Sequence, residues 1–88
     1  MKIKEGFMLR EIAGSWIVVP LSNRVVELNG IMSLSESGAL IWRKLEKGAE
    51  VKDLIDLIRS EYNVDSNTAA ADVDEFISAI GSKGLIEK

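Results

Sequence analysis

The sequence of 88 residues contains neither cysteine nor histidine. Without these side chains the chain cannot build a Cys/His zinc site, an iron–sulfur cluster, a thiol nucleophile or a histidine-based acid–base pair. Neither EF-hand spacing nor a glycine-rich phosphate loop occurs. We therefore expect no catalytic residue, no metal site and no cofactor, and we predict that the chain is not an enzyme.

Long apolar runs are also missing. No stretch approaches the roughly 20 residues that a membrane-spanning helix needs, and residues 1–6 lack the apolar core of a signal peptide. Because no disulfide can form, a cytoplasmic location is expected. The length fits one domain, residues 1–88, and a hydrophobic content of 47% fits a folded one.

The residues that are present predict three strands followed by three helices. β-prone runs occupy residues 7–12, 16–21 and 25–28, and their short separation favours an antiparallel sheet. Helical periodicity then follows an N-cap at Ser35, continues over residues 50–62, and returns from Asp65 or Ser66 to about Gly81. Residues 85–86 are expected to fold back onto the core. This order predicts an α+β fold with a winged-helix-like arrangement.

A winged helix often binds DNA through its third helix, but the charges here argue against nucleic acid. The net charge is −3, and residues 49–88 hold four Lys/Arg against nine Asp/Glu. The predicted third helix itself carries Asp72, Asp74 and Glu75. Because phosphate binding needs cations, this helix would repel a duplex. The two tryptophans, Trp16 and Trp42, have apolar neighbours and are expected in the core.

Two features favour a peptide as the partner. The strand at residues 25–28 comes last in the sheet, so one edge is expected to be open to an added strand. On the third helix Ala70, Ile77 and Gly81 share a flank beside the core stripe, with Asp74 at its margin. This flank could form a shallow trough for the peptide. Alternatively, these residues only let the helix pack closely on its own neighbours.

Several short motifs occur in a fixed order: LNG at 28–30, LSESGALIW at 34–42, Gly48, EYNVD at 61–65, DVDEFI at 72–77 and GLI at 84–86. Their order and spacing resemble the pyrroloquinoline quinone biosynthesis protein D family over nearly the whole chain. One departure is Ser35, where the family usually has Asn, and both residues cap helices well.

The resemblance implies a RiPP recognition element, which holds the leader of a ribosomally made precursor peptide as an added strand between the third strand and the third helix. A partner enzyme, often a radical S-adenosylmethionine (SAM) enzyme, then modifies the peptide. Carried onto this chain, the peptide-binding positions are Arg24, Val25, Val26, Glu27, Leu28, Ala70, Val73, Asp74 and Ile77.

The sequence therefore predicts a non-catalytic peptide chaperone. An alternative is a structural or regulatory subunit that forms a homodimer through the same sheet edge. A cation-dependent enzyme is the weakest alternative, because no nucleophile or base is assembled for it.

Overall fold

A computed structural model describes residues 1–21 and 32–87. Its main sheet is antiparallel, and its strands lie in the order β2–β3–β4. A second, two-stranded sheet pairs the two ends of the chain. The strands are β1 (Lys2–Ile3), β2 (Phe7–Ile12), β3 (Ser15–Pro20), β4 (Met32–Leu34) and β5 (Ile86–Glu87).

The hairpin between β2 and β3 turns at Ala13 and Gly14. Both residues have positive φ angles, 52° and 81°, and Ile12 pairs with Ser15 across the turn. Positive φ at both central residues is the geometry that matches the twist of a two-residue hairpin. The two strand predictions on this hairpin are confirmed to within one residue at each end, and Pro20 ends β3.

Three helices follow: α2 (Glu36–Glu46), α3 (Val51–Tyr62) and α4 (Ser66–Ser82). Their starts are set by polar caps, because the first backbone amides of a helix have no partner within it. Ser35 and Asp65 accept from the amides of Gly38 and Thr68, and Glu50 forms a capping box with Asp53. The three helix predictions are confirmed. None of the helices in residues 1–21 and 32–87 is long and apolar enough to cross a bilayer.

The third strand of the main sheet differs from the sequence prediction. β4 pairs with β3 through Trp16–Leu34, Ile17–Ser33 and Val18–Met32, and no strand was expected at these residues. The strand predicted at residues 25–28 lies outside the described residues. β4 has only three residues and lies directly before the cap of α2. Its residue pattern is therefore too short to predict a strand separate from the start of the helix.

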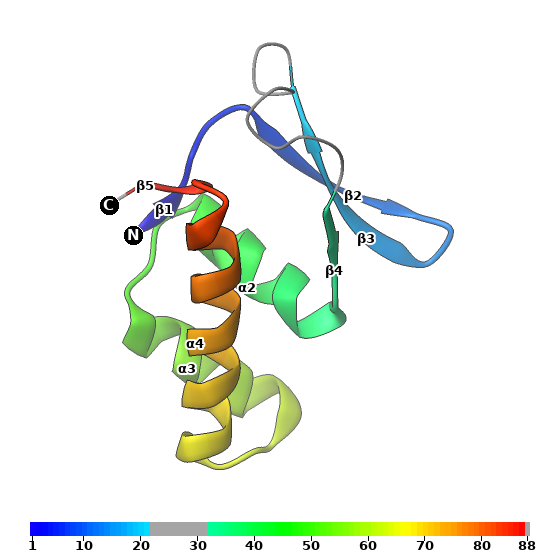
Figure 1. Cartoon of the computed structure of the whole chain (residues 1–88). Helices are drawn as coiled ribbons and strands as arrows, with labels where there is room; N and C mark the ends of the chain where they lie inside the picture. The colour runs from blue at the N-terminus through cyan, green and yellow to red at the C-terminus, as the bar shows by residue number, and fades with distance from the viewer. Residues whose placement is uncertain (22–31, 88) are drawn as a thin grey trace.

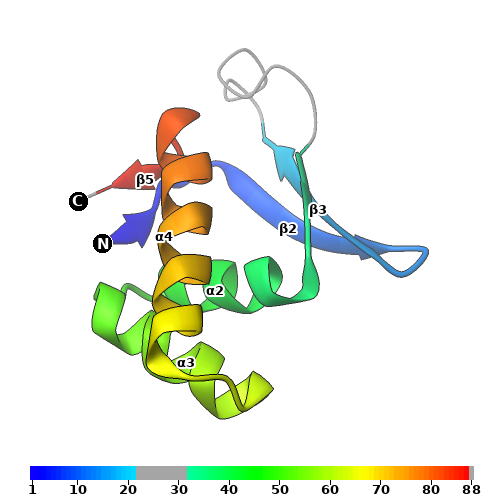
Figure 2. The same ribbon diagram turned by 60° about the horizontal axis from the view of Figure 1, so that its bottom comes forward.

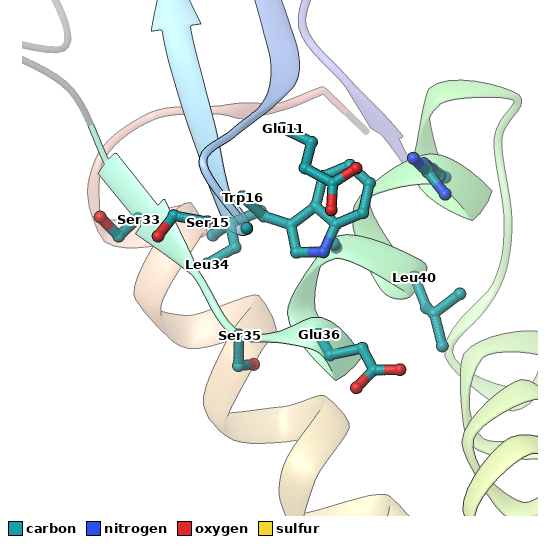
Figure 3. Close-up of a pocket in the computed structure, with 11 residues that line it drawn as sticks. Glu11, Ser15, Trp16, Ser33, Leu34, Ser35, Glu36 and Leu40 are labelled. Atoms are coloured by element: carbon teal, nitrogen blue, oxygen red, sulfur yellow. The ribbon is translucent and has the colours of Figure 1, made fainter.

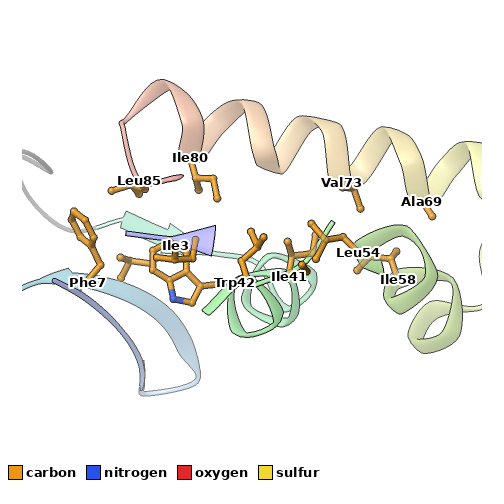
Figure 4. Packing of buried hydrophobic residues seen from close by; sticks show 13 residues of the cluster. Ile3, Phe7, Ile41, Trp42, Leu54, Ile58, Ala69, Val73, Ile80 and Leu85 are labelled. Carbon is orange, nitrogen blue, oxygen red and sulfur yellow. The ribbon is translucent and has the colours of Figure 1, made fainter. Parts of the chain in front are cut away.

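The buried core lies between the helices and the inner face of the sheet (Figure 4). Trp42 is completely buried beside Ile41 on α2, which confirms its predicted role. From α4 the core receives Ala69, Val73 and Ile80, each fully buried. Because α4 presents only this one stripe to the core, its two flanks remain for other contacts.

The two sheets lie on opposite sides of α4. Figures 1 and 2 both show β1 and β5 on one side of this helix and the three-stranded sheet on the other. In Figure 1, β4 runs alongside α4 in the opposite direction and leads into α2. As predicted, the end of the chain folds back: Leu85 is fully buried, and its carbonyl accepts from the amide of Lys4 at 2.9 Å.

Candidate functional site

β4 is an edge strand of the main sheet. It pairs with β3 on one side only, and no strand within the described residues pairs with its other side. The backbone groups of an unpaired edge are a template for another extended chain. The central residue of β4, Ser33, is exposed.

An open groove of about 350 Å³ lies between β4 and α4, and we call it the β4–α4 groove. Its walls come from segments that are far apart in the sequence but adjacent in the fold. The β4 side and the start of α2 contribute Met32, Ser33, Leu34, Ser35, Ser37, Gly38 and Ile41. The α4 side contributes Asp72, Glu75, Phe76 and Ala79.

Phe76 owes its place in this groove to Gly38. A Cβ atom at Gly38 would lie 3.0 Å from Cε1 of the Phe76 ring, which is tighter than nine in ten real Cβ contacts. The missing side chain therefore lets the ring pack against the first turn of α2. Phe76 is only partly buried, so the ring also presents apolar surface to the groove.

The junction of β4 and α2 is held by Ser35. Its Oγ atom accepts from the Gly38 amide at 3.1 Å and lies 3.2 Å from the Ser37 Oγ atom. Because the cap fixes where α2 begins, it also fixes Gly38 beneath Phe76. One serine thus connects the edge strand to the apolar part of the groove.

A second hollow of about 630 Å³ lies on the other side of Leu34, against the β2–β3 hairpin (Figure 3). Trp16 lines it, and the Arg43 guanidinium stacks over the indole, with Cζ 4.4 Å from the ring centroid. Such stacking is a cation–π contact. Trp16 is half-buried, so it is less of a core residue than predicted, whereas Trp42 is wholly in the core.

Two ionisable groups near the helix ends have shifted pKa values. The Thr68 amide donates a hydrogen bond to Asp65 Oδ1 at 2.7 Å and thereby lowers the pKa of the Asp65 carboxyl. The positive charge of Arg59 lowers this pKa to a smaller extent. Partial desolvation raises the pKa of the Tyr62 hydroxyl, followed by repulsion from Glu36 and Glu61. Both shifts fit structural roles, since neither group lines the β4–α4 groove. In the described part of the chain no cluster of carboxylates could hold a metal ion.

Four of the nine predicted site residues lie in the described part of the chain. Arg24, Val25, Val26, Glu27 and Leu28 lie outside the described residues. Val73 is fully buried in the core, so its side chain can support a groove only from beneath.

The other three predicted positions, Ala70, Asp74 and Ile77, do not line the β4–α4 groove. With 100° per residue, Ala70 and Ile77 lie on the side of α4 about 180° away from Asp72 and Ala79. That side faces the terminal strands, because a Cβ at Gly81 would meet the Ile86 Cδ1 atom at 4.0 Å.

The sequence prediction thus placed the peptide on the other side of α4 from this groove. By helical spacing Phe76 falls at the edge of the core stripe, and Asp72 and Glu75 fall beyond it. A helical wheel does show two flanks beside the Ala69–Val73–Ile80 stripe. Choosing between the flanks required the position of β4, and the sequence did not reveal that strand.

Known proteins supply an independent comparison. The family model of Coenzyme PQQ synthesis protein D (PqqD) matches residues 16–86. No curated protein matches the sequence. Among solved structures, TbiB1 in complex with the TbiA(beta) leader peptide is similar at a TM-score of 0.78 and 29% sequence identity, over 99% of this chain and 95% of that chain.

A lasso peptide synthetase B1 complexed with the leader peptide has a TM-score of 0.76 at 16% identity, over 99% of this chain and 96% of that one, which supports the fold. The fold therefore agrees with the arrangement that the sequence pattern predicted: a three-stranded antiparallel sheet followed by three helices. Since the family model spans most of the sequence, the chain belongs to the PqqD family.

Proposed function

We propose that this protein binds the leader segment of a ribosomally made precursor peptide and presents that peptide to a modifying enzyme. The leader adds as a strand to the open edge of β4 and lies in the β4–α4 groove. The observation that carries the proposal is the β4 edge, which no other described strand pairs, beside a groove with the partly exposed Phe76 ring. The two similar solved structures, both complexes with leader peptides, support it.

Strand addition accounts for how such a site works without catalytic residues. Backbone hydrogen bonds to β4 supply affinity, and alternate side chains of the peptide enter the groove. Phe76 and Ala79 offer an apolar surface to those side chains. In this proposal the protein is not an enzyme; the chemistry belongs to the partner, for which the family resemblance favours a radical SAM enzyme.

An amide NMR titration locates the site. The titrant is the leader part of a precursor peptide encoded beside the gene, with the TbiA(beta) leader as a second probe. We expect the largest shifts at Met32–Leu34 and at residues 72–79 of α4. Shifts confined to Ala70, Asp74 and Ile77 would instead return the site to the flank predicted from sequence.

Alternate N-methylation of the peptide tests strand addition without changing the protein. N-methyl groups at one set of alternate positions should remove hydrogen bonds to β4 and abolish binding, whereas the other set should leave it intact. Equal effects of both sets would exclude pairing with β4. A protein that takes up no peptide but forms dimers in light scattering would favour the alternative of a dimerising subunit, which uses the same edge.

A matched pair of variants tests the groove itself. Ala79→Trp places an indole in the groove, and Ser78→Trp places the same side chain on an exposed position of α4 outside it. We expect Ala79→Trp to weaken leader binding at least about tenfold, the effect of losing roughly 1.4 kcal/mol. Ser78→Trp should bind as the unchanged protein does. Both positions are exposed, so both variants should fold.

A further inference from the structure

The charged side chains that line the β4–α4 groove in the described part of the chain are all negative. Asp72 and Glu75 line the groove, and they are the only charged side chains among its described lining residues. Within residues 1–21 and 32–87 neither carboxylate has an ion-pair partner. Over its whole length α4 contains three carboxylates and no Lys or Arg. A peptide in the groove therefore meets negative charge that its own wall does not neutralise.

The two carboxylates are close enough to act on one cation. Residues three apart on a helix are neighbours on its surface, with Cβ atoms about 5–6 Å apart. Placed so, Asp72 and Glu75 repel each other, and a cation between them relieves that repulsion. The aliphatic stem of Lys or Arg could lie along the Phe76 ring while its charged end reaches the carboxylates.

We infer that the groove selects leaders carrying Lys or Arg at a position facing α4, together with an apolar residue at a neighbouring position on the same face. This inference rests on the proposed function, because it describes the peptide that the groove takes. Side chains of an added strand that face α4 recur at every second residue. The expected recognition pattern is therefore a cation and an apolar side chain two residues apart.

The lining of the groove changes from charged and polar at one end to apolar at the other. β4 and α4 run in opposite directions (Figure 1), so Asp72 lies toward the Ser35 end of the groove and Ala79 toward the Met32 end. Serine hydroxyls from Ser35 and Ser37 add polar character to the Asp72 end. The cation is therefore placed near the α2 cap, and the apolar side chain between Phe76 and Ala79.

A peptide library tests this selectivity without knowledge of the natural leader. Random peptides of about ten residues, the upper end of natural strand lengths, are displayed and selected on the protein. Peptides are retained only if Ala79→Trp blocks them, which restricts the pool to groove binders. We expect enrichment of Lys or Arg two residues from an apolar residue.

Charge variants then assign the selectivity to its carboxylates. In Asp72→Asn/Glu75→Asn the groove loses both charges. In the control Asp74→Asn/Asp56→Asn the net charge changes equally, but at exposed positions outside the groove. Replacing the enriched Lys by Gln should weaken binding to the unchanged protein and to the control by about two- to fivefold, and should not affect the groove variant.

A charge exchange and a salt series complete the test. Asp72→Lys/Glu75→Lys should select Asp or Glu at the same peptide position. Raising NaCl from about 0.05 to 0.5 M should weaken binding to the unchanged protein and leave the groove variant nearly unaffected.

The results of these experiments distinguish failure of the inference from failure of the proposed function. Groove binders without cation enrichment, or equal effects of the two charge variants, would overturn the inference and leave the proposed function standing. A pool with no peptide sensitive to Ala79→Trp would overturn both.

Discussion

The two flanks of α4 have different surroundings in the fold. On one flank Asp72, Phe76 and Ala79 face the edge of β4 and line an open groove. On the other, Gly81 faces Ile86 of β5, and Ile77 packs against the core. The flank beside β5, which we call the closed flank, has small and apolar residues with Asp74 at its margin, whereas the open flank has a large aromatic ring and two carboxylates.

The residue types on each side of α4 match what that side contacts. The β1–β5 pair lies on the Gly81 side of α4, where a Cβ at Gly81 would be 4.0 Å from Ile86 Cδ1, an ordinary contact distance. A flank that remains open needs side chains that tolerate water when the site is empty, and carboxylates provide this. Of the two interpretations open from the sequence, close packing fits Gly81 and its contact with β5.

The largest predicted effect removes the support that both flanks share. Ile80 is fully buried in the core stripe beneath them. Ile80→Ala should lower the free energy of unfolding by about 2–5 kcal/mol, the usual cost of such a truncation. Urea unfolding followed by circular dichroism measures this loss. Both flanks should lose order together, and a variant in which only one flank's amides shift in NMR would contradict the shared support.

A smaller predicted effect falls on the open flank alone. Gly38→Ala adds a Cβ that meets the Phe76 ring at 3.0 Å, so the ring must shift by a few tenths of an ångström within the groove wall. Leader affinity should fall by about tenfold or less, equal to at most roughly 1.4 kcal/mol. Stability should change little, because the gain in helix propensity offsets the crowding. Calorimetric titration measures the affinity, and unchanged binding would show that Phe76 does not contact the peptide.

The matching change on the closed flank is Gly81→Ala. Its Cβ would meet only Ile86 Cδ1 at 4.0 Å, an ordinary contact. Because alanine is the better helix former, the variant should be more stable by roughly 0.5 kcal/mol. Leader affinity should stay the same. If Gly81→Ala weakens binding while Gly38→Ala does not, the two flanks have been assigned the wrong way round.

The sequence predicted the elements of this fold better than it predicted the site. Helix starts follow from local chemistry, so Ser35 and Asp65 could be identified as caps without tertiary information. The site depends on which strand lies beside α4, and β4 is three residues with no clear alternation of its own. Phe76 illustrates the limit: its spacing fits the core stripe, but the ring also faces the groove.

The smallest predicted effect concerns the start of α4, where Asp65 caps the helix before either flank begins. Its folded pKa is lowered below the usual 3.8, chiefly by the Thr68 amide. The charged cap therefore stabilises the fold at pH values above about 4, and this contribution is lost as pH falls through the folded pKa.

Asp65→Asn keeps a good cap that does not titrate. Below pH 4 the melting temperature of the variant should fall less steeply than that of the unchanged protein. Thermal melts at a series of pH values measure this difference. Since the capped turn precedes both flanks, the variant should bind the leader normally at neutral pH; weaker binding there would show that the cap also positions the groove.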